Sequence, residues 1–482
     1  MNHERPRLAA ALIAAAVLAA CSRTPDTDPR MVSEWMRTLY GAIRVERLSP
    51  PVASRLFAYA TTALYSGLAA ASPDLPTLAG VLNGLPELPQ PESEQAYDGT
   101  LTAVAAERVV LDSLLREALP TTRAAVARLA DSLTSARIAA GVDEVVRARS
   151  EALGHQIGNA VVAWSRTDGF DSTRGRQYMA PTGQGLWAND APANTWAAQN
   201  LSGGSEFVAL DNPANLLRPG SASDRGLILN RPKRAGLVNL PPVNMTGMSE
   251  PYWGQVRPFV LRSWNECPVP APPSYSTDTG STLHRDARRV HETQRTLTPE
   301  QRTMAFYWAD NAGESGTPPG HWIAIASQMV SQRHLSAEEA ARLVVMTAVA
   351  QADAIIAAWG SKYQYNVIRP RTYIRSVIDS TWEPLISTPP FPEYPSGHAT
   401  QSAAAATVMT GLIGDAAFDD STSISIGHAV RRFSSVREAA AEAGLSRVYG
   451  GVHFPFGNAA GRTLGECVGT KAMERVRVSH AP

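Results

Sequence analysis

Three short segments in the last part of the chain carry residue types that together can hold an oxyanion and react at it. The first runs from 362 to 370 and places Lys362 and Arg369 seven residues apart. About two helical turns separate them, so both cations can lie on one helix face. Pro370 disfavours helical backbone at Arg369, which predicts that this arginine lies at a helix exit. Alone, the pair is equally typical of a charge cluster at a helix C-terminus.

The second segment, 394–399, reads Tyr-Pro-Ser-Gly-His-Ala and precedes an Ala-rich stretch that reaches 413. Ser396 predicts a helix N-cap, and Gly397 permits close approach of the backbone. The unpaired N–H groups of a first helical turn form an anion site, and His398 would lie beside that anion. A capped helix with a surface histidine explains the serine alone, but not the serine, glycine and histidine together.

The third segment, 446–453, supplies a further cation and a second histidine. Arg447 offers a bidentate fork for a tetrahedral oxyanion. His453, between Val452 and Phe454, is by itself more often a core residue than a functional one. The three segments together provide three cations, a hydroxyl, a glycine amide and two histidines. An enzyme that reacts at a phosphate-like oxyanion needs such a set.

In this order the segments resemble the signature of the type 2 phosphatidic acid phosphatase and vanadium haloperoxidase superfamily. That signature is Lys, six residues, Arg-Pro; then Pro-Ser-Gly-His; then Ser-Arg, five residues, His. The tracts 34–71, 250–254 and 307–322 also look like the secreted bacterial haloperoxidase branch, so the resemblance covers most of the mature chain. The signature is specific for the superfamily and less so for the reaction.

The resemblance assigns a role to each of these residues. His453 would coordinate vanadate in a peroxidase or attack phosphorus in a phosphatase, and His398 would be the acid–base group. Vanadium accepts five ligands and so mimics the transition state of phosphoryl transfer, which explains why both reactions share one site. The oxyanion oxygens would be bound by Lys362, Arg369, Ser396, Gly397 and Arg447.

One position departs from the family pattern. Four residues after the metal-binding histidine the family usually has Asp as its partner, whereas this chain has Gly457. We therefore expect Asn458 or a backbone carbonyl to orient the imidazole of His453. A neutral partner would make that imidazole less basic and weaken vanadate binding, which leaves the level of activity open.

Three further side chains resemble parts of the haloperoxidase site. Trp359 and Phe391 look like the aromatic halide-side wall of the chloroperoxidase branch, although hydrophobic packing around a helix end explains them equally well. Asp310 resembles the acidic partner of the active-site arginine, and a simple helix-end acid is the alternative.

The function that these residues predict is a vanadate-dependent haloperoxidase, which oxidises halide with hydrogen peroxide. One alternative is a periplasmic acid phosphatase that cleaves a phosphate ester through a phosphohistidine. Another is a surface lipoprotein that binds an oxyanion without catalysis, and Gly457 is its best support. A zinc site built from His321, His398 and His453 is disfavoured because no HxxxH or CxxC spacing accompanies them.

The elements that position these residues read as an all-α fold of two packed helical bundles. Apolar residues at three- and four-residue spacing predict an N-terminal helical domain at 31–166. Its helices are expected at 31–44, 51–71, 94–119 and 122–164, with a separate start near Val142-Asp143-Glu144. The C-terminal catalytic domain, 284–482, is expected to hold helices at 300–309, 321–333, 337–363, 399–413 and 435–443. Thr298 and Ser336 begin capping boxes.

The connecting segment, 167–283, has no helical period and is rich in proline and glycine. It contains Trp187, Trp196, Trp253 and Trp264, and a disordered segment of this length would have fewer aromatic residues. We therefore expect an ordered, loop-rich wrap over the helices.

The N-terminus predicts export. Arg5 and Arg7 precede an apolar stretch that ends at Cys21, and the ending resembles a bacterial lipobox. Residues 1–21 would be a signal peptide, and lipidated Cys21 would anchor the protein at the outer membrane, on the periplasmic or surface side. Cys267 and Cys467 then remain, either paired in an oxidising periplasm or as two unrelated buried thiols. By analogy with the family, a homodimer is expected.

Composition limits the choice of partner. The chain has 482 residues, 44 Lys+Arg and 44 Asp+Glu, so its formal net charge is zero. Nucleic-acid binders usually carry a basic excess, and this chain carries none. If Lys362, Arg369 and Arg447 share one pocket, the positive field is local and is balanced elsewhere.

Overall fold

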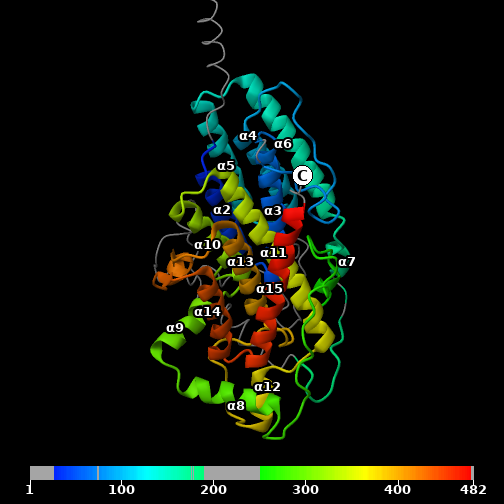
Figure 1. The fold of residues 1–482 in the computed structure, drawn as a ribbon, viewed down its shortest axis with the longest axis vertical. Coiled ribbons are helices and arrows are strands. Elements are labelled where there is room, and N and C mark those ends of the chain that lie inside the picture. The colour runs from blue at the N-terminus through cyan, green and yellow to red at the C-terminus, as the bar shows by residue number, and fades with distance from the viewer. Residues whose placement is uncertain (1–26, 73–74, 175, 177, 189–249, 479–482) are drawn as a thin grey trace, which may run out of the picture.

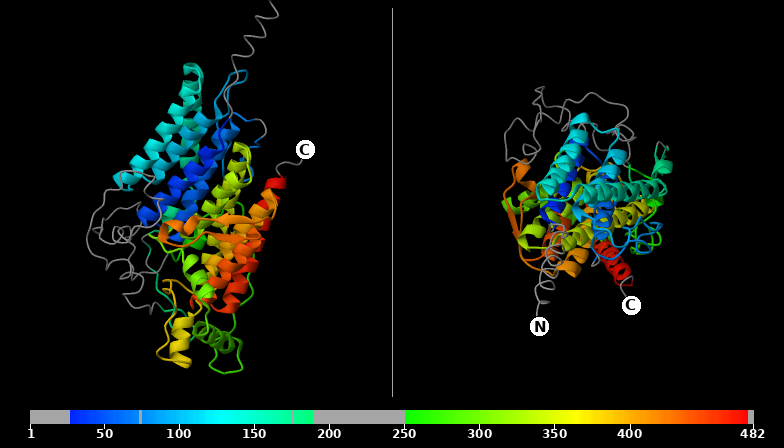
Figure 2. Two further views of the ribbon diagram at one scale, coloured as in Figure 1. Left: turned by 90° about the vertical axis from the view of Figure 1, so that its left-hand side faces the viewer. Right: turned by 90° about the horizontal axis from the view of Figure 1, so that it is seen from above.

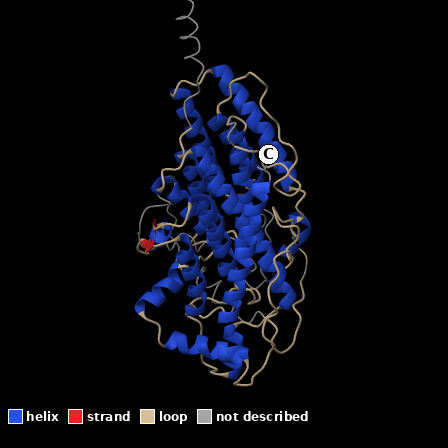
Figure 3. Ribbon diagram, in the orientation of Figure 1, coloured by secondary structure: helices blue, strands red, loops and turns tan. Residues whose placement is uncertain are grey.

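The computed structural model describes residues 27–72, 75–174, 176, 178–188 and 250–478, and nearly all of its regular structure is helical (Figure 3). The predicted all-α class is confirmed. The expected signal peptide, Cys21, Trp196 and much of the connecting segment lie outside the described residues.

The N-terminal half follows the predicted helices closely. The break between the fourth and fifth helices falls where Gly141 takes a φ of 94°, and Asp143 caps the next helix by accepting a hydrogen bond from the Val145 N–H at 2.8 Å. The elements are α2 (Arg30–Glu46), α3 (Pro50–Ala69), α4 (Gly99–Leu114), α5 (Pro120–Ala139), α6 (Glu144–Ser165) and the short α7 (Phe170–Thr173).

The C-terminal half contains the predicted helices and three that the apolar pattern did not delimit, α8, α12 and α15. Both capping boxes are formed, at Thr298 and at Ser336. Two three-residue strands pair antiparallel, with Phe418 opposite Phe433. The elements are η4 (Trp253–Gln255), α8 (Thr282–Arg295), α9 (Pro299–Tyr307), α10 (Thr317–Gln332), α11 (Ala337–Tyr365), α12 (Pro370–Val377), α13 (Gly397–Ile413), β1 (Phe418–Asp420), η5 (Thr422–Ile426), β2 (Arg431–Phe433), α14 (Val436–Tyr449) and α15 (Pro455–Val478).

Helix α11 lies at the centre of the molecule, between α3 of the N-terminal half and α13 of the C-terminal half (Figures 1 and 2). By length and composition it is the one helix among the described residues that is able to cross a membrane. However, 94% of its most apolar window is buried inside the protein, which is typical of a core helix. One hydrophobic cluster includes Trp35 of α2, Val349 of α11 and Leu464 of α15. The two helical bundles therefore share a core.

A row of glycines brings α15 against α13. Gly457, Gly461, Gly465 and Gly469 recur at every fourth position, so they share one helix face. A Cβ added to Gly461 would lie 2.5 Å from the Ser396 carbonyl oxygen, and one added to Gly465 would overlap the Thr400 carbonyl. The backbones of the two helices thus touch directly along this row, which we call the glycine seam.

The described part of the connecting segment is packed, as expected. Trp187 and Trp253 are buried, and the indole of Trp264 lies so close to Gly360 of α11 that a Cβ there would overlap it. Cys267 and Cys467 form a disulfide with an S–S distance of 2.07 Å. Of the two alternatives for these cysteines, pairing is therefore correct, and the disulfide ties the segment to α15.

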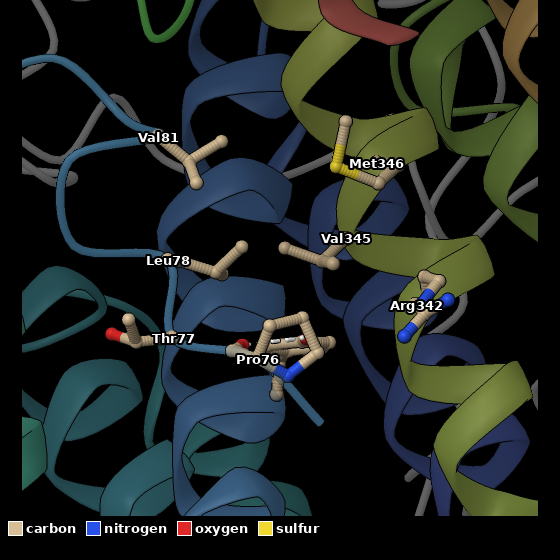
Figure 4. Close-up of a pocket in the computed structure, with 8 residues that line it drawn as sticks. Pro76, Thr77, Leu78, Val81, Arg342, Val345 and Met346 are labelled. Atoms are coloured by element: carbon tan, nitrogen blue, oxygen red, sulfur yellow. Dashed lines mark hydrogen bonds between the residues drawn. The ribbon is translucent and has the colours of Figure 1, made fainter. Parts of the chain in front are cut away.

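Two hollows lie away from the three signature segments. A niche of about 10 Å³ lies between the loop at 76–81 and Arg342, Val345 and Met346 of α11 (Figure 4). It is about as large as one water molecule, too small for a substrate. A groove of about 560 Å³ is lined by α2, α10 and the residues around η5.

Candidate functional site

The three signature segments meet where five helices begin or end. Lys362 lies in the last turn of α11, and Arg447 lies in the last turn of α14. Arg369 is the N-cap of α12 with an extended backbone (φ −79°, ψ 155°), as its neighbour Pro370 predicts. Ser396 caps α13, and His453 precedes α15. In Figure 1 the site lies in the lower half, where α15 begins near α12.

The two arginines are held by main-chain carbonyls and each keeps a donor free. Arg369 donates from Nε to the Phe391 carbonyl at 2.9 Å and from Nη1 to the Val452 carbonyl at 2.8 Å. Arg447 donates from Nη1 to the Trp308 carbonyl at 3.0 Å. The Nη2 of Arg369 and the Nε of Arg447 are buried and have no hydrogen-bond partner within the described structure. A bound oxyanion would satisfy both donors.

Lys362 uses its hydrogen bonds differently from the expectation. Its Nζ donates to the carbonyls of Pro392, Glu393 and Pro395 at 2.9, 2.9 and 2.6 Å. An ammonium has three N–H groups, so all of them are engaged with the turn that precedes α13. In this conformation Lys362 offers an oxyanion its charge, while its hydrogen bonds fix the turn.

His453 is oriented by a carboxylate that the sequence reasoning did not assign. Its Nδ1 lies 2.8 Å from Oε1 of Glu393, which also accepts the Phe454 N–H at 3.0 Å. The expectation that Asn458 or a carbonyl orients this imidazole is wrong. The Asn458 amide lies against Gly444 of α14, and its Oδ1 has no partner in the described structure. The available signal was Glu393 itself, the acid that directly precedes the second segment.

His398 lies in the first turn of α13, as predicted. It is hydrogen-bonded to the backbone of Trp308, whose carbonyl also accepts from Arg447. Its Nε2 lies 3.9 Å from Oδ2 of Asp310 and makes no hydrogen bond within the described residues. One nitrogen of this histidine is therefore anchored and the other is free for proton transfer.

Asp310 belongs to a buried ionic cluster behind His398. Its Oδ1 lies 2.8 Å from Nδ1 of His321, and Asp420 lies 2.9 Å from the other ring nitrogen. Burial opposes a charge on His321, but the two carboxylates outweigh it and raise its pKa to about 10. Asp310 also interacts with Arg447 by charge, while its Oδ1 is paired with His321. Both nitrogens of His321 are occupied, so it cannot join His398 and His453 in a zinc site.

Trp359 and Phe391 lie beside the site. Their rings are 5.0 Å apart, and the Phe391 ring lies 5.1 Å from Nζ of Lys362 and 5.0 Å from the Arg369 guanidinium. A Cβ on Gly397 would lie 3.4 Å from the Trp359 ring. The two aromatic residues therefore form an apolar wall against the cations and the start of α13.

The site as a whole is deeply buried and positively charged. Burial lowers the pKa of Arg369 to about 9 and that of Arg447 to about 10. Burial, helped by neighbouring cations, also lowers the pKa values of Lys362, His398 and His453 well below their ordinary values. Burial likewise favours the neutral form of Glu393 and raises its pKa to about 7, although Lys362 and Arg369 act against this shift. The positive charges of these buried groups are not fully balanced by neighbouring carboxylates, and a bound oxyanion would balance them.

The residues present fit vanadate or phosphate. Two arginine donors and the His398 Nε2 have no partner among the residues that the structure describes. His453 keeps Nε2 on the side of Arg369, 3.2 Å from its Nη1. The N–H groups of the first turn of α13 lie next to them. The structure brings together every residue that the sequence assigned to the oxyanion.

Comparisons with known proteins agree with this geometry. Residues 342–481 match a family model described as the VCPO second helical-bundle domain. A vanadium chloroperoxidase from Curvularia inaequalis is 24% identical over 307 residues, which are 47% of this chain and 50% of that protein. The matched part thus spans about half the length of that relative.

Two solved structures are similar over most of the chain. A bacterial vanadium-dependent iodoperoxidase is 28% identical and superimposes with a TM-score of 0.76, covering 94% of this chain and 98% of that one. A holo-type bacterial vanadium-dependent chloroperoxidase shares the fold, at 16% identity and a TM-score of 0.60, covering 90% and 93%. The signature, the fold and these relatives together support placing the chain in the vanadium haloperoxidase and type 2 phosphatidic acid phosphatase superfamily.

Proposed function

We propose that the protein is a vanadate-dependent haloperoxidase that oxidises halide with hydrogen peroxide. The observation that carries this proposal is a set of buried polar atoms beside His453 that have no hydrogen-bond partner within the described structure. They are the donors Arg369 Nη2 and Arg447 Nε and the ring nitrogen His398 Nε2. Vanadate, when bound, would supply the electrophilic centre that activates hydrogen peroxide toward halide.

The residues of the chain take distinct roles in this proposal. His453 would hold vanadium through Nε2, and the two arginines would bind its oxygens. Lys362 contributes charge and keeps the turn at 392–395 in place. His398 would accept and return the proton of peroxide, because its Nε2 is free and burial keeps its pKa low enough for a neutral ring.

The aromatic wall, Trp359 and Phe391, is the proposed halide side of the site. An apolar wall next to cations lowers the cost of desolvating a large, weakly hydrated halide. We therefore propose iodide as the first halide to test, in line with the name of the iodoperoxidase relative.

The test measures halide oxidation by peroxide with and without added vanadate, beside hydrolysis of a phosphate ester by the same preparation. Iodide oxidation that depends on vanadate supports the proposal. Ester hydrolysis without halide oxidation would instead favour the phosphatase alternative, and vanadate uptake without either turnover would favour a binding protein. His453→Ala should abolish either reaction, while His155→Ala on the exposed face of α6 should change neither.

We also propose that the protein is an exported lipoprotein anchored through Cys21. The disulfide between Cys267 and Cys467 supports an oxidising compartment, because cytoplasmic thiols are kept reduced. Cys21→Ala should move the protein from the membrane fraction to the soluble periplasmic fraction. Unchanged membrane association of that variant contradicts the lipid anchor.

A further inference from the structure

We infer that Glu393 is the positioning carboxylate of His453 and that Gly457 is the space it requires. The family pattern places this carboxylate four residues after the histidine. In this chain the carboxylate comes instead from the turn before α13, 60 residues earlier in the sequence. This inference rests on the proposed vanadate site and identifies the residue that orients its histidine.

Glu393 is fixed through both its backbone and its side chain. Its N–H donates to the Val367 carbonyl at 3.0 Å, and its carbonyl accepts from Lys362 at 2.9 Å. Its side chain is fully buried, with Oε1 between the Nδ1 of His453 and the Phe454 N–H. A turn held at so many points presents its carboxylate in one orientation.

This hydrogen bond determines the tautomer of His453. Oε1 already accepts the Phe454 N–H, and as an acceptor toward the imidazole it places the ring proton on Nδ1. Nε2 is then the nitrogen with the lone pair, and it faces Arg369 Nη1 at 3.2 Å. A ligand to vanadium needs this tautomer, and a carboxylate partner also makes the imidazole a stronger donor to the metal.

Gly457 makes the arrangement possible. A Cβ at this position would overlap both carboxylate oxygens of Glu393. The Glu393 carboxylate therefore occupies the volume into which a side chain at 457 would project, next to the same imidazole nitrogen. The carbonyl of Gly457 accepts the Ser396 N–H at 2.9 Å, which joins the start of α15 to the cap of α13. A glutamate at 393 and an aspartate at 457 would thus place their carboxylates in the same volume beside His453, so only one of them can be present.

The test is an exchange of the carboxylate between the two positions. The variants are Glu393→Gln, Glu393→Ala, Gly457→Asp and the double change Glu393→Ala/Gly457→Asp. Vanadate affinity is measured by calorimetry across pH, inorganic phosphate affinity is measured in the same way, and circular dichroism checks folding. Inorganic phosphate is the selective control because it would be held by the same cations through hydrogen bonds and charge, without a coordination bond to Nε2 of His453.

Glu393→Gln and Glu393→Ala should weaken vanadate binding roughly 10–100-fold, the range found for such outer partners, and leave phosphate binding within about twofold. Gly457→Asp should be the worst single change because two carboxylates share one volume. The double variant should recover most of the vanadate affinity of the native protein.

Three results would overturn the inference: native vanadate affinity in Glu393→Ala, equal losses for vanadate and phosphate in Glu393→Gln, or a folded double variant no better than Glu393→Ala. Glu393→Gln preserves the volume of the side chain, so it keeps the test valid if the alanine variant does not fold. Failure of the native protein to oxidise halide would contradict the proposed function alone, since every readout here is a binding affinity.

Discussion

Arg447 shows how much of the site depends on the shape of single side chains. Its Nη1 donates to the Trp308 carbonyl, while its Nε has no partner in the described part of the chain and can donate to an oxyanion. A lysine has one ammonium and cannot reach both places at once. The planar fork, and not the charge alone, is therefore required.

Arg447→Lys should accordingly weaken binding of vanadate and phosphate by roughly 10–100-fold, equivalent to a charge-assisted hydrogen bond of about 1.5–3 kcal/mol. Calorimetric titration with each anion measures the change. Arg462→Lys is the matched control, since that arginine is 67% exposed on α15 and pairs with Glu466 on the same helix. Equal affinities in the Arg447→Lys and native proteins would contradict the role of the fork.

At this scale the sequence predicted the chemistry of the site well and its partners less well. Lys362, Arg369 and Arg447 belong to compact motifs, so their residue types and spacing identify them without a fold. The partner of His453 is 60 residues away. The contact exists because Lys362 folds the turn at 392–395 against α11, and no local pattern encodes that turn.

Helix α15 was missed for a reason that lies in its composition. Each glycine in a helix costs about 1 kcal/mol relative to alanine, and four glycines at regular spacing remove the apolar face that identifies a helix. Packing against α13 overrides this weak propensity. The seam is visible in the sequence only as a four-residue period of glycines, and not as a period of apolar side chains.

The seam predicts that a change which normally favours helices is harmful here. Gly465→Ala should destabilise the protein by about 1–3 kcal/mol, because its Cβ would overlap the Thr400 carbonyl and lie 2.8 Å from the Ala403 Cβ. Urea unfolding measures this difference.

Gly411→Ala in α13 is the matched control for the seam. Its added Cβ would meet only the flexible end of Met473, at 3.1 Å. This variant should be neutral or stabilised by up to about 1 kcal/mol. Equal responses of the two variants would argue against direct backbone contact.

For the whole molecule, the sequence predicted two helical bundles but not their shared core. The contacts that join them, such as those of α3 with α11, connect residues hundreds of positions apart. Periodicity indicates which face of a helix is apolar, but not which other helix covers that face. The disulfide likewise joins residues that are far apart in the sequence, so periodicity does not predict it.

The disulfide should contribute to global stability. It joins residues separated by 200 positions, and closing such a loop typically stabilises a folded chain by about 2–4 kcal/mol. The double variant Cys267→Ser/Cys467→Ser should therefore unfold at a lower temperature. A reductant should lower the melting temperature of the native protein to that of the variant and leave the variant unchanged. An unaffected native protein would show that the bond adds no stability.

The cluster of His321, Asp310 and Asp420 should give the protein a specific pH dependence. The folded pKa of His321, about 10, lies above its ordinary 6.5. The stabilisation is therefore complete below about pH 6.5 and is lost as the pH rises through 10, by up to about 1.4 kcal/mol per pH unit. Urea unfolding of the native protein at pH 6 to 10 measures this slope.

His321→Asn should be less stable at pH 6 and should show a flatter slope between pH 7 and 10. His155→Asn, an exposed histidine on α6, is the control and should follow the native curve. A native protein whose stability does not fall over this range would show that His321 carries no buried charge.

The shared place of Glu393 and Gly457 also limits how such a site can arise during evolution. From an ancestor with aspartate at 457, gaining glutamate at 393 first would crowd two carboxylates into one volume. Gaining glycine first passes through a protein that folds but binds its anion weakly. The second order avoids this overlap, so ancestral reconstruction should place the glycine before the glutamate.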